Sequence, residues 1–343
     1  MTAAELRAAR ERVLEQALHP LPGAWFAEGV MDAVSRAVGF DGYCLFGVDP
    51  VSHLRSMMFS RNGLRVASQR LVENETVEQD LNRYVDLVGG ARHVGLLGGA
   101  GAAAPPSPRL HEILRPEGFT SELRLALVSG GRYWGALSLF REEKRHPFDD
   151  ADADAATALT DALSTALRRY QAGRPGAERD YRPSGVVLVD HRGSIRGQSQ
   201  DATAWLLALC DSREGGVTED DISRVVLEVA AAAHDRRSDA VCRARMPKGG
   251  WLVASGSCLD DEDGADVAVV LQAGDSAAVA PALAVWCGLT SREARVLTLA
   301  TSGLAPKHMA RQLGLSVLTV NDHLRSIYRK ADVHGRDELL SLM

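Results

Sequence analysis

Apolar residues recur along the chain at two different spacings, which predict a mixture of helices and strands. Residues 1–20 place apolar side chains at helical intervals without a basic-then-apolar order, so they predict an amphipathic helix and not a signal peptide. Apolar residues recur again at helical intervals over residues 25–38, which predicts a second helix. The apolar run GYCLFGV that follows Gly39-Phe40-Asp41 predicts a strand.

A hairpin and a long helix close the first block, which spans residues 21–171. Two apolar runs flank Ser129-Gly130-Gly131, a turn sequence typical of hairpins. The stretch FDDADADAATALTDALSTALRRY then predicts one continuous helix with acidic residues at its start and arginines at its end, as the helix dipole favours. Its apolar stripe either covers the sheet of its own domain or forms a subunit contact. The stripe consists of Ala156, Leu159, Leu163, Ala166 and Tyr170.

Three stretches of small and polar residues interrupt this pattern. GLLGGAGAAAPPSP, over residues 95–108, predicts a loop inside the first block. QAGRPGAERDYRPSG, over residues 171–185, is rich in Gly, Pro and Arg and contains the linker that we place at residues 172–183. QAGDSAAVAP, over residues 272–281, predicts a second, flexible break.

The second block, residues 184–275, predicts an α+β domain built on an antiparallel sheet. GVVLVDHRGSIRG predicts two strands around an Asp-His-Arg-Gly turn. A short helix follows around Trp205, and a longer helix spans residues 222–233. A hairpin that turns at residues 247–250 and a last strand, DVAVVLQ, complete the order of elements.

Residues 276–343 predict a compact all-α module in which each helix has a recognisable start. A capping box of Thr290 and Glu293 opens the first helix. Pro306 opens the second helix without a polar cap, and Ser316 caps the third. A glycine stands at the end of each of the first two helices, as is typical of helix ends.

The third helix of this module separates an apolar side from a polar side. Val320, Leu324, Ile327 and Ala331 recur at steps of four, three and four, so they predict a buried stripe. Two short helices joined by a tight turn, with the second polar outward, form the helix-turn-helix layout, whose second helix fits the major groove. The outward side carries Asn321, Asp322, Arg325, Ser326, Arg329 and Lys330.

Charge distinguishes this module from the rest of the chain. The protein as a whole is acidic, with 39 Lys and Arg against 45 Asp and Glu. From Trp286 onward there are eight cations against five carboxylates, whereas the remaining chain has 31 against 40. A basic helical module on an acidic protein favours a polyanionic partner, and duplex DNA is the partner that we expect.

The same residues resemble the LuxR-type DNA-binding domain. The resemblance covers the last 58 residues of the chain. It implies a four-helix module whose fourth helix, residues 336–343, contributes to dimerisation. The matching motifs are Leu289-Thr290-x-Arg292-Glu293, Val296-Leu297, Gly303, Met309-Ala310, Leu313, Ser316, Thr319-Val320-x-x-His323 and Lys330.

The resemblance also implies roles for residues of the third helix. Asn321, Asp322 and Arg325 match positions that reach base edges, and Thr319 and Lys330 match positions that contact phosphate. The chain departs from the family at positions 321 and 322, where a cation is frequent. Here Asn321 suits adenine, Asp322 can accept from cytosine N4, and Arg325 suits guanine. An equal alternative is that Asp322 orients Arg325 or Arg329 within the helix. His323 (packed or contacting phosphate), Arg329 and Lys307 complete the predicted DNA-binding set.

The two upstream blocks resemble sensor domains. Residues 21–171 are similar to a GAF domain through the hairpin Trp134-Gly135-Ala136-Leu137-Ser138-Leu139-x-Arg141 and the closing helix. Residues 184–275 are similar to a PAS-type domain through Gly185-Val-Val-Leu-Val-Asp190-x-x-Gly193. Both families hold small molecules between sheet and helices or serve as dimer scaffolds, and both alternatives stay open. Likewise Trp134, Tyr43 and Phe46 either line a GAF cavity or belong to the core.

Residue patterns typical of enzymes and metal sites are absent from the sequence. G-x-S-x-G, H-E-x-x-H and the P-loop are missing, and Pro105-Pro106 prevents Gly98–Ala103 from opening a dinucleotide-binding helix. The five cysteines form no C-x-x-C pair, and Asp149–Asp154 is explained as an acidic helix start. No run of about 18 apolar residues predicts a membrane span. We therefore expect no catalysis, metal, cofactor or membrane contact.

Together these patterns predict a cytoplasmic, one-component DNA-binding transcription regulator. The expected fold is that of α+β sensor domains, with antiparallel sheets and flanking helices, followed by an all-α helix-turn-helix domain. The expected partners are double-stranded DNA, a second copy of the chain in a homodimer, a small-molecule effector in the GAF-like or PAS-like domain, and RNA polymerase. The alternative is a signalling scaffold whose GAF/PAS-like domains bind a protein partner while the tail binds DNA weakly or not at all.

Overall fold

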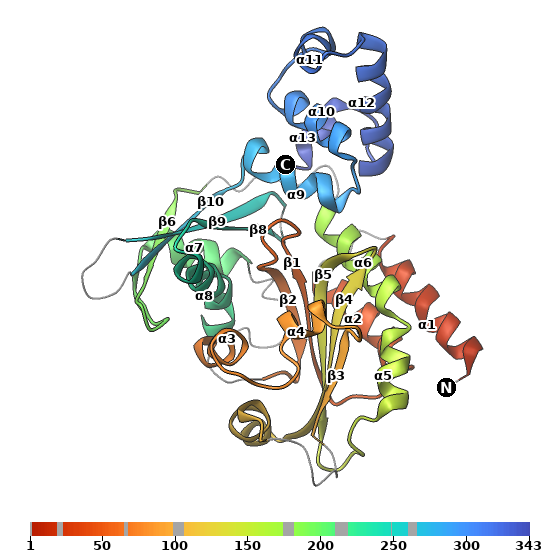
Figure 1. The fold of residues 1–343 in the computed structure, drawn as a ribbon, viewed down its shortest axis with the longest axis vertical. Helices are drawn as coiled ribbons and strands as arrows, with labels where there is room; N and C mark the ends of the chain where they lie inside the picture. Colours follow the sequence, from red (N-terminus) through yellow and green to blue (C-terminus); the bar gives the residue numbers. More distant parts are fainter. Residues whose placement is uncertain are drawn as a thin grey trace.

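The computed structural model describes residues 2–18, 23–64, 68–98, 106–173, 182–209, 219–247, 249–259 and 266–343. Within these ranges the chain forms two five-stranded antiparallel sheets, each with flanking helices, and a carboxyl-terminal run of helices (Figure 1). The predicted fold class is therefore confirmed.

The first sheet has the strand order β2-β1-β5-β4-β3, with every neighbouring pair antiparallel. The predicted turn joins β4 to β5 through Gly130 and Gly131, which both have positive φ, a conformation that favours glycine. Strand β1 pairs with β5, which places Gly42 opposite Phe140 and joins the two parts of the sheet, β2-β1 and β5-β4-β3. The strands are β1 (Gly42–Val48), β2 (Arg55–Arg61), β3 (Val94–Leu97), β4 (Phe119–Ser129) and β5 (Arg132–Glu142).

Helices cover both faces of this sheet. On one face α1, α2, α5 and α6 share a hydrophobic core, into which α1 inserts Ala9 and Val13. On the other face lie α3, α4 and the short helical turns η1 and η2 (Figure 1). Their bounds are α1 (Ala3–Gln16), α2 (Gly23–Ser35), α3 (Ser68–Thr76), α4 (Tyr84–Gly89), η1 (Arg109–Leu114), η2 (Arg115–Glu117), α5 (Asp150–Thr157) and α6 (Thr160–Ala172).

The prediction of one continuous helix over residues 148–170 is wrong, because the chain bends at Ala158-Leu159 and forms α5 and α6. The bend lets α5 pack against β3 and β4 while α6 packs against β4, β5 and β1, so the two helices follow the twisted sheet. The predicted apolar stripe, from Ala156 to Tyr170, packs within this core. It therefore covers its own sheet and is not free to form a subunit contact.

The loop predicted over residues 95–108 is partly a strand. Val94–Leu97 pairs with β4 as the edge strand β3, because its apolar side chains reach the core of the sheet. Residues 99–105, and residues 174–181 of the predicted linker, lie outside the described residues.

The flexible break predicted over residues 272–281 is wrong for most of its length. The strand β10 continues to Ala273, and the helix α9 begins at Ser276. The Asp275 side chain accepts a hydrogen bond from the Ala278 N–H and caps this helix. Because alanine has the highest helix propensity, the small residues that suggested a loop extend the helix once it is capped.

The second sheet repeats the connectivity of the first, with the strand order β7-β6-β10-β9-β8. The helices α7 and α8 pack on one of its faces, around Trp205 and Val226. The predicted order of strand pair, helices, hairpin and last strand is confirmed, although Lys248 in the hairpin turn lies outside the described residues. The elements are β6 (Gly185–Val189), β7 (Ile195–Gln198), α7 (Gln200–Leu209), α8 (Glu219–Arg236), β8 (Ala240–Arg245), β9 (Trp251–Cys258) and β10 (Val267–Ala273).

The two sheets meet at their edges, β2 from the first and β8 from the second, without forming a continuous sheet. The Asp49 carboxylate accepts hydrogen bonds from the backbone N–H of Arg243 at 3.0 Å and from its guanidinium at 2.8 Å. Glu228 of α8 accepts the Arg55 N–H at 3.1 Å, and the Cys242 thiol donates to the Arg55 carbonyl oxygen at 3.3 Å. Side chains therefore satisfy polar groups of both edge strands and cover those edges.

The carboxyl-terminal module packs its helices around one hydrophobic core. The predicted helix starts are confirmed: Thr290 and Glu293 form a capping box, Ala305 provides no side-chain cap, and the Ser316 hydroxyl accepts the Thr319 N–H. The helices are α9 (Ser276–Trp286), α10 (Ser291–Thr301), α11 (Pro306–Leu313), α12 (Val317–Ala331) and α13 (Arg336–Ser341).

The Glu293 carboxylate joins α10 to α12. It accepts hydrogen bonds from the Thr290 N–H at 2.7 Å, the Ser326 hydroxyl at 2.6 Å and the Lys330 ammonium at 2.7 Å. Burial raises the pKa of Glu293, but the hydrogen bonds from Lys330, Ser326 and Thr290 together outweigh burial. They lower the pKa of Glu293 from its usual 4.5 to about 2.

Replacing Asp49 with Asn is expected to destabilise the junction between the sheets, because the Arg243 guanidinium would stay buried without its anionic partner. We expect a loss of about 3 kcal/mol in the free energy of unfolding, measured by urea denaturation. The control is Asp32→Asn, since the exposed Asp32–Arg36 pair should contribute about 0.5 kcal/mol or less. Equal losses for the two variants would contradict this role of Asp49.

Replacing Glu293 with Gln is expected to lower the free energy of unfolding of the carboxyl-terminal module by about 2 kcal/mol. In the unmodified protein the Glu293 contribution should be complete above about pH 4.5 and lost as the pH falls towards 2, because the unfolded chain binds the proton first. Thermal unfolding followed by circular dichroism across this range measures the difference between the two proteins. The exposed Asp337→Asn serves as control, and a pH dependence that is the same with and without Glu293 would refute the prediction.

Candidate nucleic-acid interface and cavity

The apolar stripe of α12 lies in the core of the carboxyl-terminal module, as predicted. Val320 and Ile327 are fully buried, Leu324 is buried, and Ala331 is half-buried. Because the stripe fixes the rotation of the helix, the opposite side of α12 faces outward. In Figure 1, α11 and α12 lie at the end of the molecule away from the two sheets, whereas α9 lies beside them.

The predicted DNA-binding residues differ in exposure. Asp322, Arg325 and Arg329 on α12 are exposed, as is Lys307 on α11, which places cations on both helices of the pair. The half-buried members of the set are Thr319, Asn321, His323 and Lys330.

Asp322 forms an ion pair with Arg325 one turn further along α12. A guanidinium nitrogen of Arg325 lies 3.2 Å from a carboxylate oxygen of Asp322, and the Arg325 side chain is 77% exposed. Of the two roles predicted for Asp322, orienting Arg325 within the helix is the one that this geometry supports.

Lys330 and Thr319 both have partners within the module. The Lys330 ammonium donates to Glu293 and, at 3.2 Å, to the Gly288 carbonyl oxygen. The Thr319 hydroxyl lies 2.9 Å from the hydroxyl of Ser316, the cap of α12. The Lys330 ammonium is therefore engaged in joining helices, and its predicted phosphate contact competes with that role.

Two apolar residues at the start of α12 were missed in the sequence. Leu318 is 69% exposed and Val317 is 43% exposed. Both come directly before the polar residues of the outward face in the sequence. Because they fall outside the buried four-three-four stripe, their spacing could have identified them. An exposed aliphatic side chain beside Asn321 can contact the methyl group of thymine in a major groove.

A tryptophan pair connects the carboxyl-terminal module to the second sheet. The rings of Trp251, on β9, and Trp286, at the end of α9, stack with centroids 4.9 Å apart. The Trp251 indole N–H donates to the Leu342 carbonyl oxygen at 2.6 Å. Trp134, which was considered a lining residue of a GAF cavity, joins the core around this pair and links it to the first sheet.

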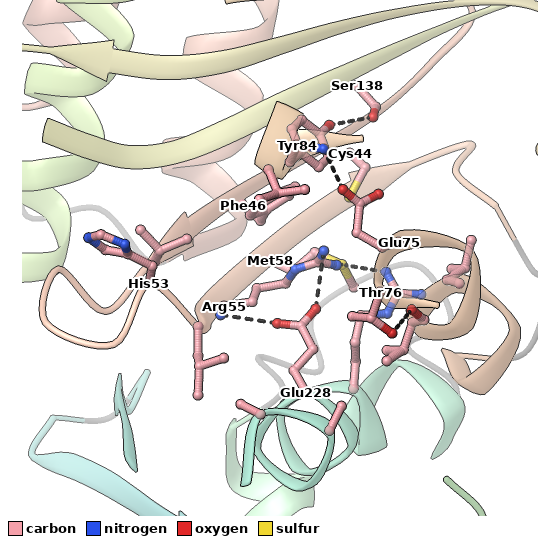
Figure 2. A pocket seen from close by; sticks show the side chains of 18 of the residues that line it. Cys44, Phe46, His53, Arg55, Met58, Glu75, Thr76, Tyr84, Ser138 and Glu228 are labelled. Atoms are coloured by element: carbon pink, nitrogen blue, oxygen red, sulfur yellow. Dashed lines mark hydrogen bonds and ion pairs between the residues drawn. The ribbon is translucent and has the colours of Figure 1, made fainter. Parts of the chain in front are cut away.

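A cavity of about 460 Å³ lies between the first sheet and α8 of the second domain (Figure 2). Strands β1, β2 and β5 form its floor, α3 and α4 form one side, and α8 closes it with Arg224 and Glu228. Phe46 lines this cavity, whereas Tyr43 belongs to the core on the other face of the sheet. The sequence did not reveal these walls, because they come from segments far apart in the chain.

The deep end of the cavity is polar and internally paired. Arg124 donates to Glu75 at 2.8 Å and stacks over the Tyr84 ring, whose hydroxyl lies 2.7 Å from that of Ser138. Burial is the largest influence on the pKa of Glu75 and raises it, but Arg124, the Tyr84 N–H and Arg109 together outweigh burial, so the net shift of the pKa is downward and Glu75 stays ionised. Burial raises the pKa of Tyr84 to about 12, so its hydroxyl keeps its proton.

At the other end of the cavity Arg55 reaches across to α8. One guanidinium nitrogen lies 3.2 Å from Glu228, and the guanidinium carbon lies 4.0 Å from the centroid of the Phe46 ring (Figure 2). Burial is the largest influence on the pKa of Arg55 and lowers it, yet Glu228, Cys44, Tyr133 and Tyr84 together outweigh burial and raise the pKa overall, so the guanidinium is charged. A charged group of the first domain thus meets the second domain at the wall of the cavity.

In the described part of the chain, no three His, Cys, Asp or Glu side chains gather closely enough to hold a metal ion. Among the same residues, no helix combines the length and the apolar character needed to cross a bilayer. The free cysteines described are Cys44, Cys242, Cys258 and Cys287.

The chain is similar to known proteins in two separate regions. The family model of bacterial regulatory proteins of the LuxR family matches residues 288–343, and the GAF domain model matches residues 26–167. Among curated proteins, the monoamine regulon transcriptional regulator of Klebsiella aerogenes is 42% identical over 53 residues, which are 16% of this chain and 23% of that protein. The chain thus spans less than a quarter of the length of this curated relative.

Two solved structures give weaker similarity. The GAF domain of a phosphoenolpyruvate-protein phosphotransferase from Coxiella burnetii is 17% identical with a TM-score of 0.33, over 49% of this chain and 95% of that one. VqmA of Vibrio cholerae, a LuxR-type receptor, is 19% identical with a TM-score of 0.21, over 47% of this chain and 81% of that one. The domain assignments rest on the two family models and on the fold. The chain therefore joins an amino-terminal GAF domain to a carboxyl-terminal helix-turn-helix domain of the LuxR family.

Proposed function

We propose that the protein is a DNA-binding transcription regulator whose upstream domains sense a small molecule or a partner and control the carboxyl-terminal helix-turn-helix domain. The observation that carries this proposal is the division of α12. Its inner side forms the core of the module, while Leu318 and Arg325 on the outer side are exposed and Asn321 is half-buried. The helix itself lies at the end of the molecule away from the two sheets (Figure 1). The match of residues 288–343 to the LuxR family supports duplex DNA as the partner.

On DNA, the outer side of α12 would enter the major groove. Arg325 would bind the acceptor pair of guanine with Asp322 fixing its orientation, Asn321 would bind adenine, and Leu318 would contact a thymine methyl group. Contacts to phosphate would fix the position of the module on the duplex but would carry no sequence information. The residues proposed for phosphate are Lys307, Thr319, His323 and Arg329, with Lys330 acting mainly through Glu293.

We further propose that two copies of the chain act together in the cytoplasm, so that paired modules read a two-fold related site and affect RNA polymerase there. The central domain would serve as a PAS-type sensor, and its strand pair, helices and hairpin are in keeping with that assignment. The same architecture without sequence-specific DNA binding would make the protein a signalling scaffold. The DNA-binding experiment below distinguishes these two functions.

The tryptophan pair is the proposed route between sensing and DNA binding. Trp251 holds α9 and Leu342 against the second sheet, so a shift of that sheet would move the whole module. The Trp286 indole N–H is buried and has no hydrogen-bond partner among the described residues, which costs about 1–3 kcal/mol. This cost lowers the stability of the contact between the module and the second sheet. The contact can therefore open or close in response to small structural changes in the upstream domains.

Replacing Arg325 with Ala is expected to relax base preference by about 1–3 kcal/mol at one position of the bound sequence. The preferred duplex is first selected from a random pool by the unmodified protein and then titrated by fluorescence anisotropy at several salt concentrations. Affinity should fall steeply with salt. The control is Arg36→Ala in the first domain, which removes the same charge from an exposed position directly after α2.

Two results would contradict this assignment. An unchanged base preference in the Arg325→Ala variant would remove Arg325 from direct recognition. Selection of no preferred duplex by the unmodified protein, with weak binding to every sequence, would favour the scaffold.

Replacing Trp251 with Phe is expected to loosen the joint, because the ring stays but the hydrogen bond to Leu342 is lost. A loss of about 1 kcal/mol should accelerate amide hydrogen exchange in α9 and α13 by about fivefold, and Trp251→Ala should accelerate it further. The control Trp25→Phe alters an exposed tryptophan and should leave exchange unchanged. Uniform exchange rates across all three variants would show that Trp251 does not hold the module.

A further inference from the structure

The charged side chains in the lining of the cavity already have partners or face solvent. Arg55 forms an ion pair with Glu228 at 3.2 Å (Figure 2), and Arg124 forms one with Glu75 at 2.8 Å. The other charged residues of the lining are Arg109, which pairs with Glu122 at 2.6 Å, Arg224, which contacts the Met58 sulfur at 3.3 Å and has a further partner, and the exposed Asp235 and Arg236. A charged ligand would therefore lose its hydration without gaining a counter-charge, which opposes its binding.

The rest of the lining is mainly apolar and comes from both domains. In the first domain the rings of Phe46 and Tyr84 meet edge to face, with centroids 5.0 Å apart, and Val72 and Val88 add aliphatic surface from α3 and α4. The second domain contributes Ala232 of α8. A volume of about 460 Å³ lies within the range of pockets that enclose small organic molecules.

Tyr133 brings a neutral polar group to this apolar lining. The residue lies on β5 and is half-buried, and its ring packs against the cluster around Phe46 and meets the His53 ring edge on, with centroids 6.2 Å apart. Its hydroxyl forms no hydrogen bond with the described residues, whereas the Tyr84 hydroxyl is paired with that of Ser138. Burial raises the pKa of Tyr133 well above its usual range, so the hydroxyl keeps its proton and can both donate and accept a hydrogen bond.

We infer that this cavity binds an uncharged, mainly apolar small molecule with one hydrogen-bonding oxygen, whose apolar part packs between Phe46 and α8 and whose oxygen bonds to the Tyr133 hydroxyl. The inference rests on the proposed sensor function and specifies the ligand class. Because the walls come from both domains, the bound molecule would fill the space between the first sheet and α8 and would stabilise the folded arrangement of the two domains. A carboxylate of the same size would be rejected, since the charges of the lining are already paired.

The test measures displacement of a neutral fluorescent probe, N-phenyl-1-naphthylamine, from the full chain. The probe should bind saturably at a single site. Two competitors share the naphthalene skeleton and differ little in size: 2-acetylnaphthalene is uncharged, and 2-naphthoate is an anion at neutral pH. The ketone should displace the probe at a concentration at least about tenfold lower than the carboxylate, because the carboxylate would be desolvated without a counter-charge.

Replacing Tyr133 with Phe tests the hydrogen bond. The variant should bind 2-acetylnaphthalene about three- to tenfold more weakly, because one net hydrogen bond is lost. It should bind 2-ethylnaphthalene, which lacks the oxygen, as tightly as the unmodified protein does. The matched control is Tyr328→Phe, which removes a phenol hydroxyl from α12 in the carboxyl-terminal module and should change neither affinity.

Replacing Ala232 with Leu tests the location of the site. The larger side chain would occupy part of the cavity from the side of α8, so both neutral naphthalenes should bind at least about fivefold more weakly. Circular dichroism of each variant shows that the fold is retained.

Three outcomes would overturn the inference. They are displacement by the carboxylate as readily as by the ketone, a Tyr133→Phe variant that treats the ketone and the ethyl compound alike, and unchanged affinities in the Ala232→Leu variant. None of these measurements uses DNA, so their failure is distinct from failure of the duplex titration. A protein that binds its selected duplex but accepts the carboxylate equally well would keep its regulatory function and lose this ligand class.

Discussion

The arrangement of the molecule depends on how two sheet edges are kept together without joining into one sheet. Strands β2 and β8 lie side by side, and the carboxylates of Asp49 and Glu228 satisfy backbone N–H groups that a further strand would otherwise bind. Each carboxylate also forms an ion pair with an arginine of the other domain, Asp49 with Arg243 and Glu228 with Arg55, so desolvated charges are paired. This contact creates the cavity, because it places α8 over the face of the first sheet that carries α3 and α4.

From this junction a continuous series of contacts leads to the DNA-binding surface. The second sheet carries α8 on one side and, through Trp251, the module that contains α12 on the other. Glu293 then fixes α12 against α10 inside the module. The cavity wall and α12 are therefore connected through packed elements, by way of α8, the second sheet and the tryptophan pair.

Local signals explain what could be predicted from the sequence. Some features depend only on neighbours within a few residues, so they could be predicted from the sequence. They are the capping box at Thr290, the glycine turn before Arg132 and the apolar stripe of α12. The bend at Ala158-Leu159 and the helix after Asp275 were missed, because packing against the sheet and a single cap decided them. The cavity could not be predicted from the sequence, because Arg55 and Glu228 are 173 positions apart and only the fold brings them together. The ion pair between Asp322 and Arg325 was one of two alternatives in the sequence, and only the structure shows that it forms.

The pairing of β1 with β5 has a consequence for biosynthesis. A nascent chain leaves the ribosome from its amino end, so the centre of the first sheet stays open until Glu142 has emerged, and α8 arrives about eighty residues later still. During that interval the apolar wall around Phe46 is exposed to solvent. Chaperones that shield hydrophobic surface would act in this window, and truncated chains that stop before Glu219 would be those most prone to aggregate.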